Sequence, residues 1–145
     1  MRYRHILAAV GLDDDGLTVL KRAQNLASQY QATLSVLHVV EYIPLESGEA
    51  LMAMPTDLSQ QLVQQAREQL TQRCEAYGIP AAALEIANGN AAREIRRVAA
   101  DKGADLIVVG HHPRHGWATL FSHTEENLVT RAECDVMVVA LSRES

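Results

Sequence analysis

The chain lacks the features that hold small domains together covalently or through a metal. Its 145 residues include only two cysteines, Cys74 and Cys134, which lie far apart and belong to no Cys-x-x-Cys pair. A disulfide framework and a thiolate metal site are therefore not indicated, and reduced cysteines favour a cytoplasmic protein. A single domain over residues 1–145 is long enough to bury about two-thirds of its unfolded surface without such a staple.

The chain also lacks long apolar runs and an excess of positive charge. No stretch approaches the ~18 to 20 apolar residues of a membrane helix, and the apolar run near the N-terminus is too short for a signal peptide. We therefore expect a soluble, unprocessed protein without a membrane partner. The net charge of −5 argues against a nucleic-acid partner, because phosphate backbones bind clustered Lys and Arg that outweigh nearby carboxylates.

What the chain contains is a regular alternation of apolar runs and amphipathic helical patterns. Most of the apolar runs carry Val, Ile or Leu at successive positions, which indicates strands buried on both faces of a parallel sheet. Gly78 and Gly103 are predicted to end the second and third helices, Asn90 to cap the third, and Ser122 with Glu125 to begin the fourth. The candidate strands are Tyr3–Val10, Thr33–Val40, Ala82–Ala87, Asp105–Gly110 and Asp135–Leu141.

This order predicts an α/β fold: a single-domain, doubly wound, open parallel five-stranded sheet with helices on both faces, of Rossmann-like architecture. Ligands of such sheets bind at the carboxyl ends of the strands, where the winding direction reverses. The turn that leaves the fourth strand lies at such an end. The long loop Tyr42–Thr56, with Met52 and Met54, is expected at the same edge, and we interpret it as a surface loop rather than a ligand shield.

The turn after the fourth strand is poorly suited to a polyphosphate. Gly110 and Gly116 allow close approach, but Pro113 removes a backbone donor and His123 adds bulk. Carboxylates occupy the first turn of the fourth helix, at Glu125 and Glu126, and the start of the first helix, at 13–15. They stabilise the helices and repel phosphate.

Several segments in order, HILAAV, LHVVE, GAD before LIVVG, and ENLVTRAECDVMVVAL, resemble the universal stress protein family over essentially the whole chain. The run GHH after the fourth strand is similar to the branch typified by the enterobacterial universal stress protein A. In nucleotide-binding members the fourth strand leads into three spaced glycines and a Ser or Thr. Laid on this chain, those positions are Gly110, Pro113, His123 and Thr124.

The resemblance thus implies a member without a bound nucleotide. Two of the three glycines are missing, and the aspartate that helps to hold the nucleoside in those members is replaced by Gly11. The family further implies support of cell survival under starvation, oxidative or similar stress. We expect a protein that binds partners, has no catalytic residues and needs no cofactor.

The main alternative is an adenine-nucleotide-binding stress protein. In that case Val39, Gly110, Gly116 and Thr124 would hold ATP or AMP with Mg, and slow ATP hydrolysis would follow. A flavodoxin-like electron carrier shares the architecture, but the single tryptophan and the absence of an aromatic-rich loop place it third.

The histidines suggest a metal only weakly. His111, His112, His115 and His123 lie close together in sequence, yet a loop of this spacing specifies no convergent geometry, and we expect no physiological metal. His5 and His38 lie on strands and are expected to find partners within the sheet or at its ends.

Two surfaces point to partners. Arg93, Arg96 and Arg97 fall on one helical face, which we interpret first as a solvated basic stripe and second as an attraction for an acidic partner or a phosphate. The last strand, as a sheet edge, predicts a homodimer through Val136–Leu141, because an apolar edge tends to pair with a second copy. The resemblance implies the same homodimers, and heterodimers with paralogues.

Overall fold

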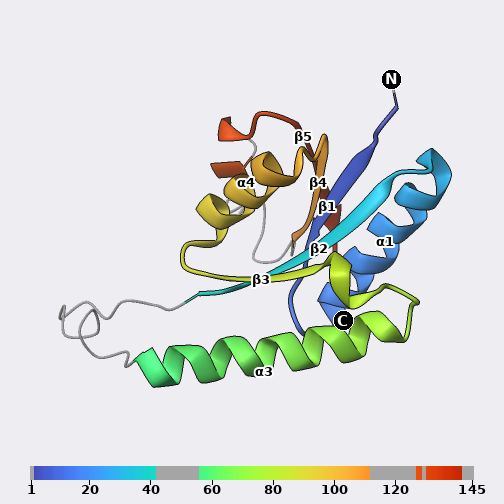
Figure 1. Ribbon diagram of the computed structural model, residues 1–145. Coiled ribbons are helices and arrows are strands. Elements are labelled where there is room, and N and C mark those ends of the chain that lie inside the picture. Colours follow the sequence, from blue (N-terminus) through green and yellow to red (C-terminus); the bar gives the residue numbers. More distant parts are fainter. Residues whose placement is uncertain (1, 42–55, 112–126, 129, 142–145) are drawn as a thin grey trace.

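The computed structural model describes residues 2–41, 56–111, 127–128 and 130–141. A parallel five-stranded sheet in the order β3-β2-β1-β4-β5 forms the centre of the fold (Figure 1). The chain builds outward from β1 to β3, returns to the other side of β1 and ends at β5. The predicted doubly wound sheet is therefore confirmed, and its winding reverses between β1 and β4. The strands are β1 (His5–Ala9), β2 (Thr33–Val40), β3 (Leu84–Asn88), β4 (Leu106–His111) and β5 (Asp135–Ala140).

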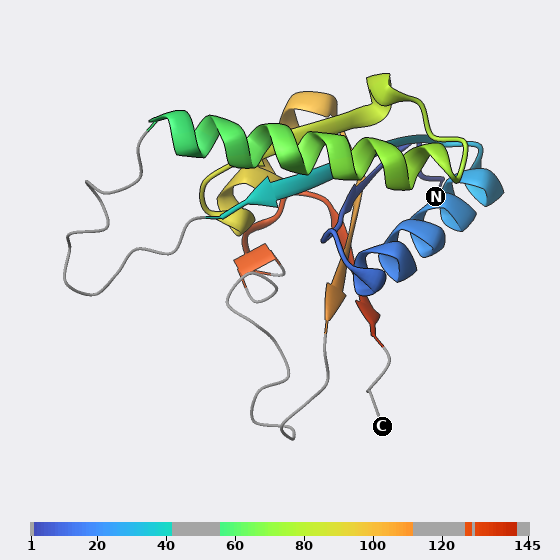
Figure 2. The same ribbon diagram turned by 90° about the horizontal axis from the view of Figure 1, so that it is seen from below.

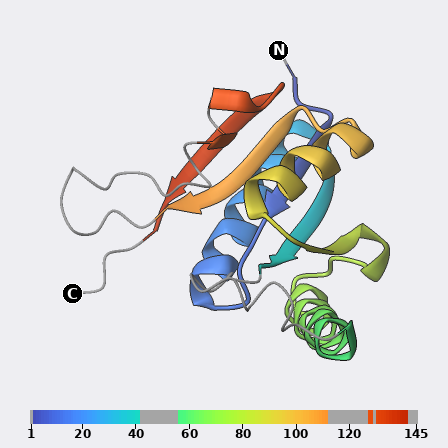
Figure 3. The ribbon, with the colours of Figure 1, turned by 90° about the vertical axis from the view of Figure 1, so that its left-hand side faces the viewer.

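Helices cover both faces of the sheet. On one face lie α1 (Asp14–Tyr30) and α3 (Thr56–Glu75), which stand in front of the strands in Figure 2. On the opposite face lies α4 (Ala91–Lys102), which Figure 3 shows across the sheet from α1. Residues 127–128 and 130–131 are also helical, while the predicted start of that helix at Ser122 lies outside the described residues.

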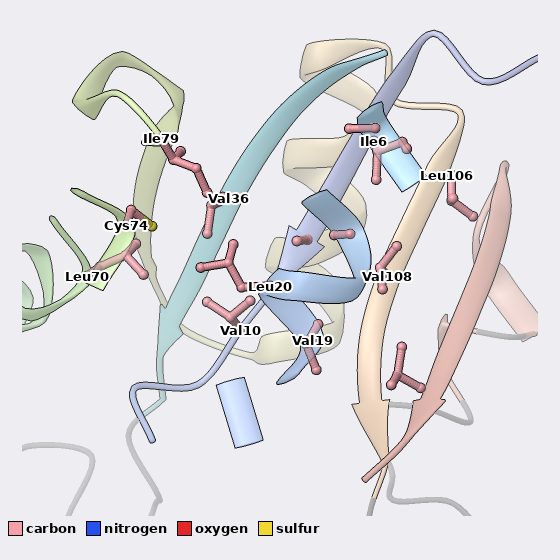
Figure 4. Packing of buried hydrophobic residues seen from close by; sticks show 14 of the residues in the cluster. Ile6, Val10, Val19, Leu20, Val36, Leu70, Cys74, Ile79, Leu106 and Val108 are labelled. Carbon is pink, nitrogen blue, oxygen red and sulfur yellow. The ribbon is translucent and has the colours of Figure 1, made fainter. Parts of the chain in front are cut away.

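Two apolar clusters fill the spaces between these layers. Under α1 and α3, Leu20, Leu70 and the Cys74 thiol pack on Val36 of β2 and its neighbours (Figure 4). Under α4, Ile95 and Val98 pack on Leu7 and Ile107. Because adjacent residues of a strand face opposite sides, the continuous apolar runs supply both clusters at once.

Most predicted helix ends are confirmed. The Asn90 side chain accepts a hydrogen bond from Arg93 N at 2.9 Å, and Gly103 ends α4 in the left-handed region. Gly78 follows α3 with a φ of +73°. The end of α1 was not predicted, because it is Gln31, a residue with a side chain, that takes the left-handed conformation there.

The predicted strand bounds need small corrections. The third strand begins at Leu84 rather than Ala82, since Ala81–Ala83 form a single 3-10 turn after Pro80. The first strand is shorter than predicted and starts at His5. In the part of the chain that the structure describes, no helix is both long and apolar enough to cross a membrane.

Candidate functional site

A cavity of about 280 Å³ opens at the carboxyl ends of β1, β2 and β4, where the winding reverses. Its walls come from the turn between β1 and α1, from the ends of β2 and β4, and from the first turns of α4. The position agrees with the place where parallel sheets of this kind bind ligands. The described lining consists of Ala9, Val10, Gly11, Asp13, Asp15, Gly16, Val19, Leu37, His38, Val39, Ala91, Ile95, Val109, Gly110 and Leu141.

The turn between β1 and α1 is compact because two glycines meet in it. A Cβ placed on Gly16 would lie 2.0 Å from the carbonyl oxygen of Gly11, so only glycine fits at the start of this helix. The Asp13 side chain caps α1 by accepting a hydrogen bond from Gly16 N at 3.0 Å. The predicted carboxylate at the start of the first helix is thus confirmed, and it binds a backbone donor that an anion would otherwise use.

The N-terminus of α4, on the other side of the cavity, is occupied in the same way. The Glu41 carboxylate accepts a hydrogen bond from Ala91 N at 3.2 Å, while Asn90 accepts from Arg93 N. Nothing in the sequence pattern pointed to Glu41, because it follows β2 and is far from α4 in the chain. The helix ends beside the cavity therefore both carry side-chain oxygens on their free N–H groups.

The charge of the cavity is negative. Asp13 and Asp15 line it, and no Lys or Arg appears in its described lining. His38 lines it as well, but its Nδ1 lies 2.8 Å from the carbonyl oxygen of Val10, so that ring atom is engaged with the main chain. Hydroxyl and amine donors fit such a surface better than phosphates do.

Two of the predicted nucleotide-contacting residues line this cavity, and two are not described. Val39 and Gly110 both belong to its wall, whereas Gly116 and Thr124 lie outside the described residues, as do Pro113 and His123. The structure also gives Gly110 a packing role: a Cβ there would approach a methyl of Val19 and one of Leu141 at 2.9 Å each. A glycine at this position is therefore no evidence for a phosphate.

The strand histidines have the partners that were expected of them. His5 Nε2 lies 2.8 Å from the hydroxyl of Ser35, and burial lowers the pKa of His5, with the positive charge of Lys102 acting in the same direction. This Ser–His contact forms no catalytic triad. Ser35 is buried, and the Asp105 carboxylate accepts backbone N–H groups of Arg4 and His5 rather than binding the ring.

Of the four histidines considered as metal ligands, the structure describes His111. His111 closes β4 and is half-buried, whereas His112, His115 and His123 lie outside the described residues. Among the residues that the structure describes, no three His, Cys, Asp or Glu side chains are grouped as metal ligands. The absence of a physiological metal stays a prediction.

The three arginines of α4 divide into two kinds. Arg97 binds Glu94 and Asp101 at 2.8 and 3.2 Å, and hydrogen bonding to Glu94 raises its pKa. Arg93 and Arg96 have no ion pair within the described part of the chain. The predicted arginine stripe is present, but the neighbouring acids Glu94 and Asp101 both pair with Arg97.

Comparison with known proteins agrees with this fold and topology. The family model described as the universal stress protein family matches residues 2–140. A Coxiella burnetii protein named universal stress protein A homolog 1 is 34% identical over 140 residues, which cover 96% of this chain and 97% of the relative.

Solved structures give the same result. A Pseudomonas aeruginosa structure titled as a universal stress protein has a TM-score of 0.73 and 25% identity, covering 97% of this chain and 48% of the other, so this chain spans about half of its length. A structure titled as a universal stress protein in complex with cAMP has a TM-score of 0.60 and 22% identity, covers 96% of this chain and 98% of the other, and supports the fold alone. The chain belongs to the universal stress protein family.

Proposed function

We propose that this universal stress protein acts by binding rather than by turnover, and that its carboxyl-end cavity does not hold a polyphosphate. The observation that carries the proposal is the capping of both helix N-termini beside the cavity by the carboxylates of Asp13 and Glu41. A phosphate placed there meets negative charge where phosphate sites offer free N–H groups. We further propose, from the resemblance to this family, that the protein supports cell survival under starvation, oxidative or similar stress and acts in the cytoplasm.

Binding without catalysis is supported by the composition of the cavity wall. Its described residues include no nucleophilic side chain next to a base, which covalent catalysis requires. No cofactor is needed for this function.

The second candidate is binding of an adenine nucleotide, ATP or AMP with Mg. Val39 and Gly110 line one cavity, as that alternative requires, and a universal stress protein solved in complex with cAMP shares the fold. Asp13 and Asp15 are more compatible with the hydroxyls of a sugar than with a phosphate chain.

Calorimetric titration with ATP and Mg distinguishes the two candidates. We expect no submicromolar affinity for the wild-type protein and no nucleotide released on denaturation. Asp13→Asn keeps a good N-cap but removes the charge, and it should raise ATP affinity about three- to tenfold. Asp14→Asn is the matched control, since Asp14 lies in the same turn but not on the cavity, and it should change affinity less. Submicromolar affinity or co-purified ATP in the wild type would overturn the proposal.

We further propose that the protein forms a homodimer through β5, over Val136–Leu141, and heterodimers with paralogues through the same edge. Sheet order places β5 at the edge, beside β4 only. Leu141 N donates to His111 O at 2.8 Å. Because backbone groups alternate in direction along a strand, the N–H of Val138 points away from β4. The side chains of Val136 and Val138 are half-buried in the single chain.

Val138→Pro therefore tests the interface without removing a β4–β5 hydrogen bond. We expect a monomer in sedimentation velocity, while Val138→Thr, which keeps the N–H and the branched shape, should stay dimeric. A wild-type monomer, or a Val138→Pro dimer of unchanged stability, would contradict this interface.

A further inference from the structure

A second cavity, of about 630 Å³, lies along α4 on the side toward β5. One wall is the exposed flank of α4 with Arg93 and Arg96, and the other is the segment 131–134 with Arg131. Among the residues that the structure describes, the carboxyl-end cavity and this groove share no lining residue. It is therefore a separate surface, and its volume falls within the range of small-molecule sites, about 300 to 1,000 Å³.

The groove is strongly positive although the chain is acidic. Its described lining holds Arg93, Arg96, Arg97 and Arg131 but only one acid, Glu133, in a protein of net charge −5. The neighbouring acids do not neutralise it evenly, because Glu94 and Asp101 bind Arg97.

The other guanidinium groups of the groove keep donors for a ligand, although the Nε of Arg96 donates a hydrogen bond to the carbonyl oxygen of Ala92 at 3.4 Å. In the described part of the chain, Arg93, Arg96 and Arg131 form no ion pair. Arg93 and Arg96 are neighbours on the helix surface, where like charges repel each other. An anion between them relieves that repulsion and gains charge-assisted hydrogen bonds, which guanidinium groups form with carboxylates and phosphates in a fixed fork geometry.

The rest of the lining is apolar. Ala100, which is exposed, and Ala104, which is half-buried, contribute aliphatic carbon, and Cys134 contributes a half-buried thiol whose pKa is raised by burial. A bare inorganic anion would leave this surface unused. A ligand with an apolar body removes it from water, which is favourable in proportion to the apolar area buried.

From these features we infer that this groove along α4 binds an amphipathic anion: a small molecule with a carboxylate or phosphate headgroup held by Arg93, Arg96 and Arg131 and a short apolar body over Ala100, Ala104 and Cys134. This inference is independent of the function proposed for the carboxyl-end cavity, because it concerns different residues.

Alkylation of Cys134 by N-ethylmaleimide reports on the groove directly. The other cysteine, Cys74, is fully buried, and digestion followed by mass spectrometry separates the two. Octanoate and octyl phosphate are the probes, with 1-octanol and inorganic phosphate as controls that each lack one half of the chemistry. At ten times the dissociation constant of a probe, the rate at Cys134 should fall about tenfold. A difference between octanoate and octyl phosphate identifies the headgroup that the groove prefers.

The role of the arginines is tested by comparing the alkylation rate of Cys134 with and without probe in arginine variants. Arg96→Gln with Arg131→Gln should weaken probe binding by roughly tenfold or more, and Arg131→Gln alone, at an exposed position, by less. Arg67→Gln with Arg73→Gln makes the same change in charge on α3, across the sheet, and should leave protection intact.

Four results would overturn the inference. They are no protection by either probe, equal protection by 1-octanol, protection by inorganic phosphate as strong as by octyl phosphate, and protection that survives the double Arg96 and Arg131 variant. Protection by an acidic peptide such as hexaglutamate but by neither probe would assign the groove to a protein partner instead.

Discussion

Replacing Gly16 by alanine tests how the β1–α1 turn is built. Two effects of this change have opposite signs. Helix propensity favours alanine over glycine by about 1 kcal/mol in a helix interior. Sterically, the new Cβ would lie 2.0 Å from Gly11 O and 2.7 Å from Gly11 C. An ordinary contact begins at 3.4 Å, so the two segments would have to move apart by about 1.4 Å.

The obstacle is backbone on both sides, so no flexible side chain can turn away. Gly11 lies just after β1, and Gly16 is a buried residue in the first turn of α1. Inserting a group into a packed site costs about 1 to 3 kcal/mol and occasionally more. Because the obstacle is backbone, we take the upper end of this range, about 3 kcal/mol, and after the propensity gain of about 1 kcal/mol we expect the free energy of unfolding to fall by about 2 kcal/mol.

Urea denaturation followed by far-UV circular dichroism measures this change, with the slope in urea used to check that both proteins unfold in two states. Gly78→Ala is the control, because a Cβ there meets nothing within 4 Å and only the φ of +73° opposes it. It should cost about 1 kcal/mol. A Gly16→Ala protein as stable as the wild type, or more stable, would mean that the close approach of Gly11 and Gly16 does not constrain the turn.

Three further predictions concern caps and titrating groups. Asn90→Ala should lower the free energy of unfolding by about 1 kcal/mol by removing the N-cap of α4, and Asn90→Ser should restore most of it; equal stability of all three proteins in urea would contradict the cap. Burial holds the pKa of His5 below its ordinary 6.5 in the folded protein, so the unfolded chain takes up the proton first as the pH falls. The free energy of unfolding should therefore decrease as the pH drops below about 6.5 and should level off below the folded pKa. Urea midpoints measured across pH 5 to 7.5 should depend less on pH in His5→Gln than in the wild type. Tyr3 donates a hydrogen bond to Asp135 at 2.7 Å, which raises its pKa to about 12, so its stabilising contribution should disappear as pH rises from about 10 to 12. An absorbance titration should show one late-ionising tyrosine that is missing in Tyr3→Phe, and its persistence in that variant would refute the assignment.

Much of the fold was predictable because local rules determine it. Continuous apolar runs identify strands that are covered on both faces, and the order of strands and helices with right-handed crossovers leaves few sheet topologies. Asn90 and Gly103 mark the ends of α4 through hydrogen bonds and backbone geometry within a few residues of them. The carboxylate at the start of α1 was predictable for the same reason.

The candidate sites were less predictable, because they depend on residues that are distant in the chain. Glu41 reaches the N-terminus of α4 only after β2 and β3 have paired. The packing of Gly110 against Val19 and Leu141 appears only when α1 and β5 flank β4. Likewise, the spacing of the arginines predicted a stripe on one face of α4, but the groove forms only because the segment 131–134 packs beside that face as a second wall.

The sequence by itself thus determined the strands, most helix ends and the order that makes a doubly wound sheet, since each is set by periodicity or by contacts within one or two turns. Only the tertiary structure decided that Glu41 reaches the N-terminus of α4 and which arginines of α4 have acidic partners. Hydrogen bonds and ion pairs act over a few ångströms, and distances of that size between remote residues are fixed only when the layers have packed.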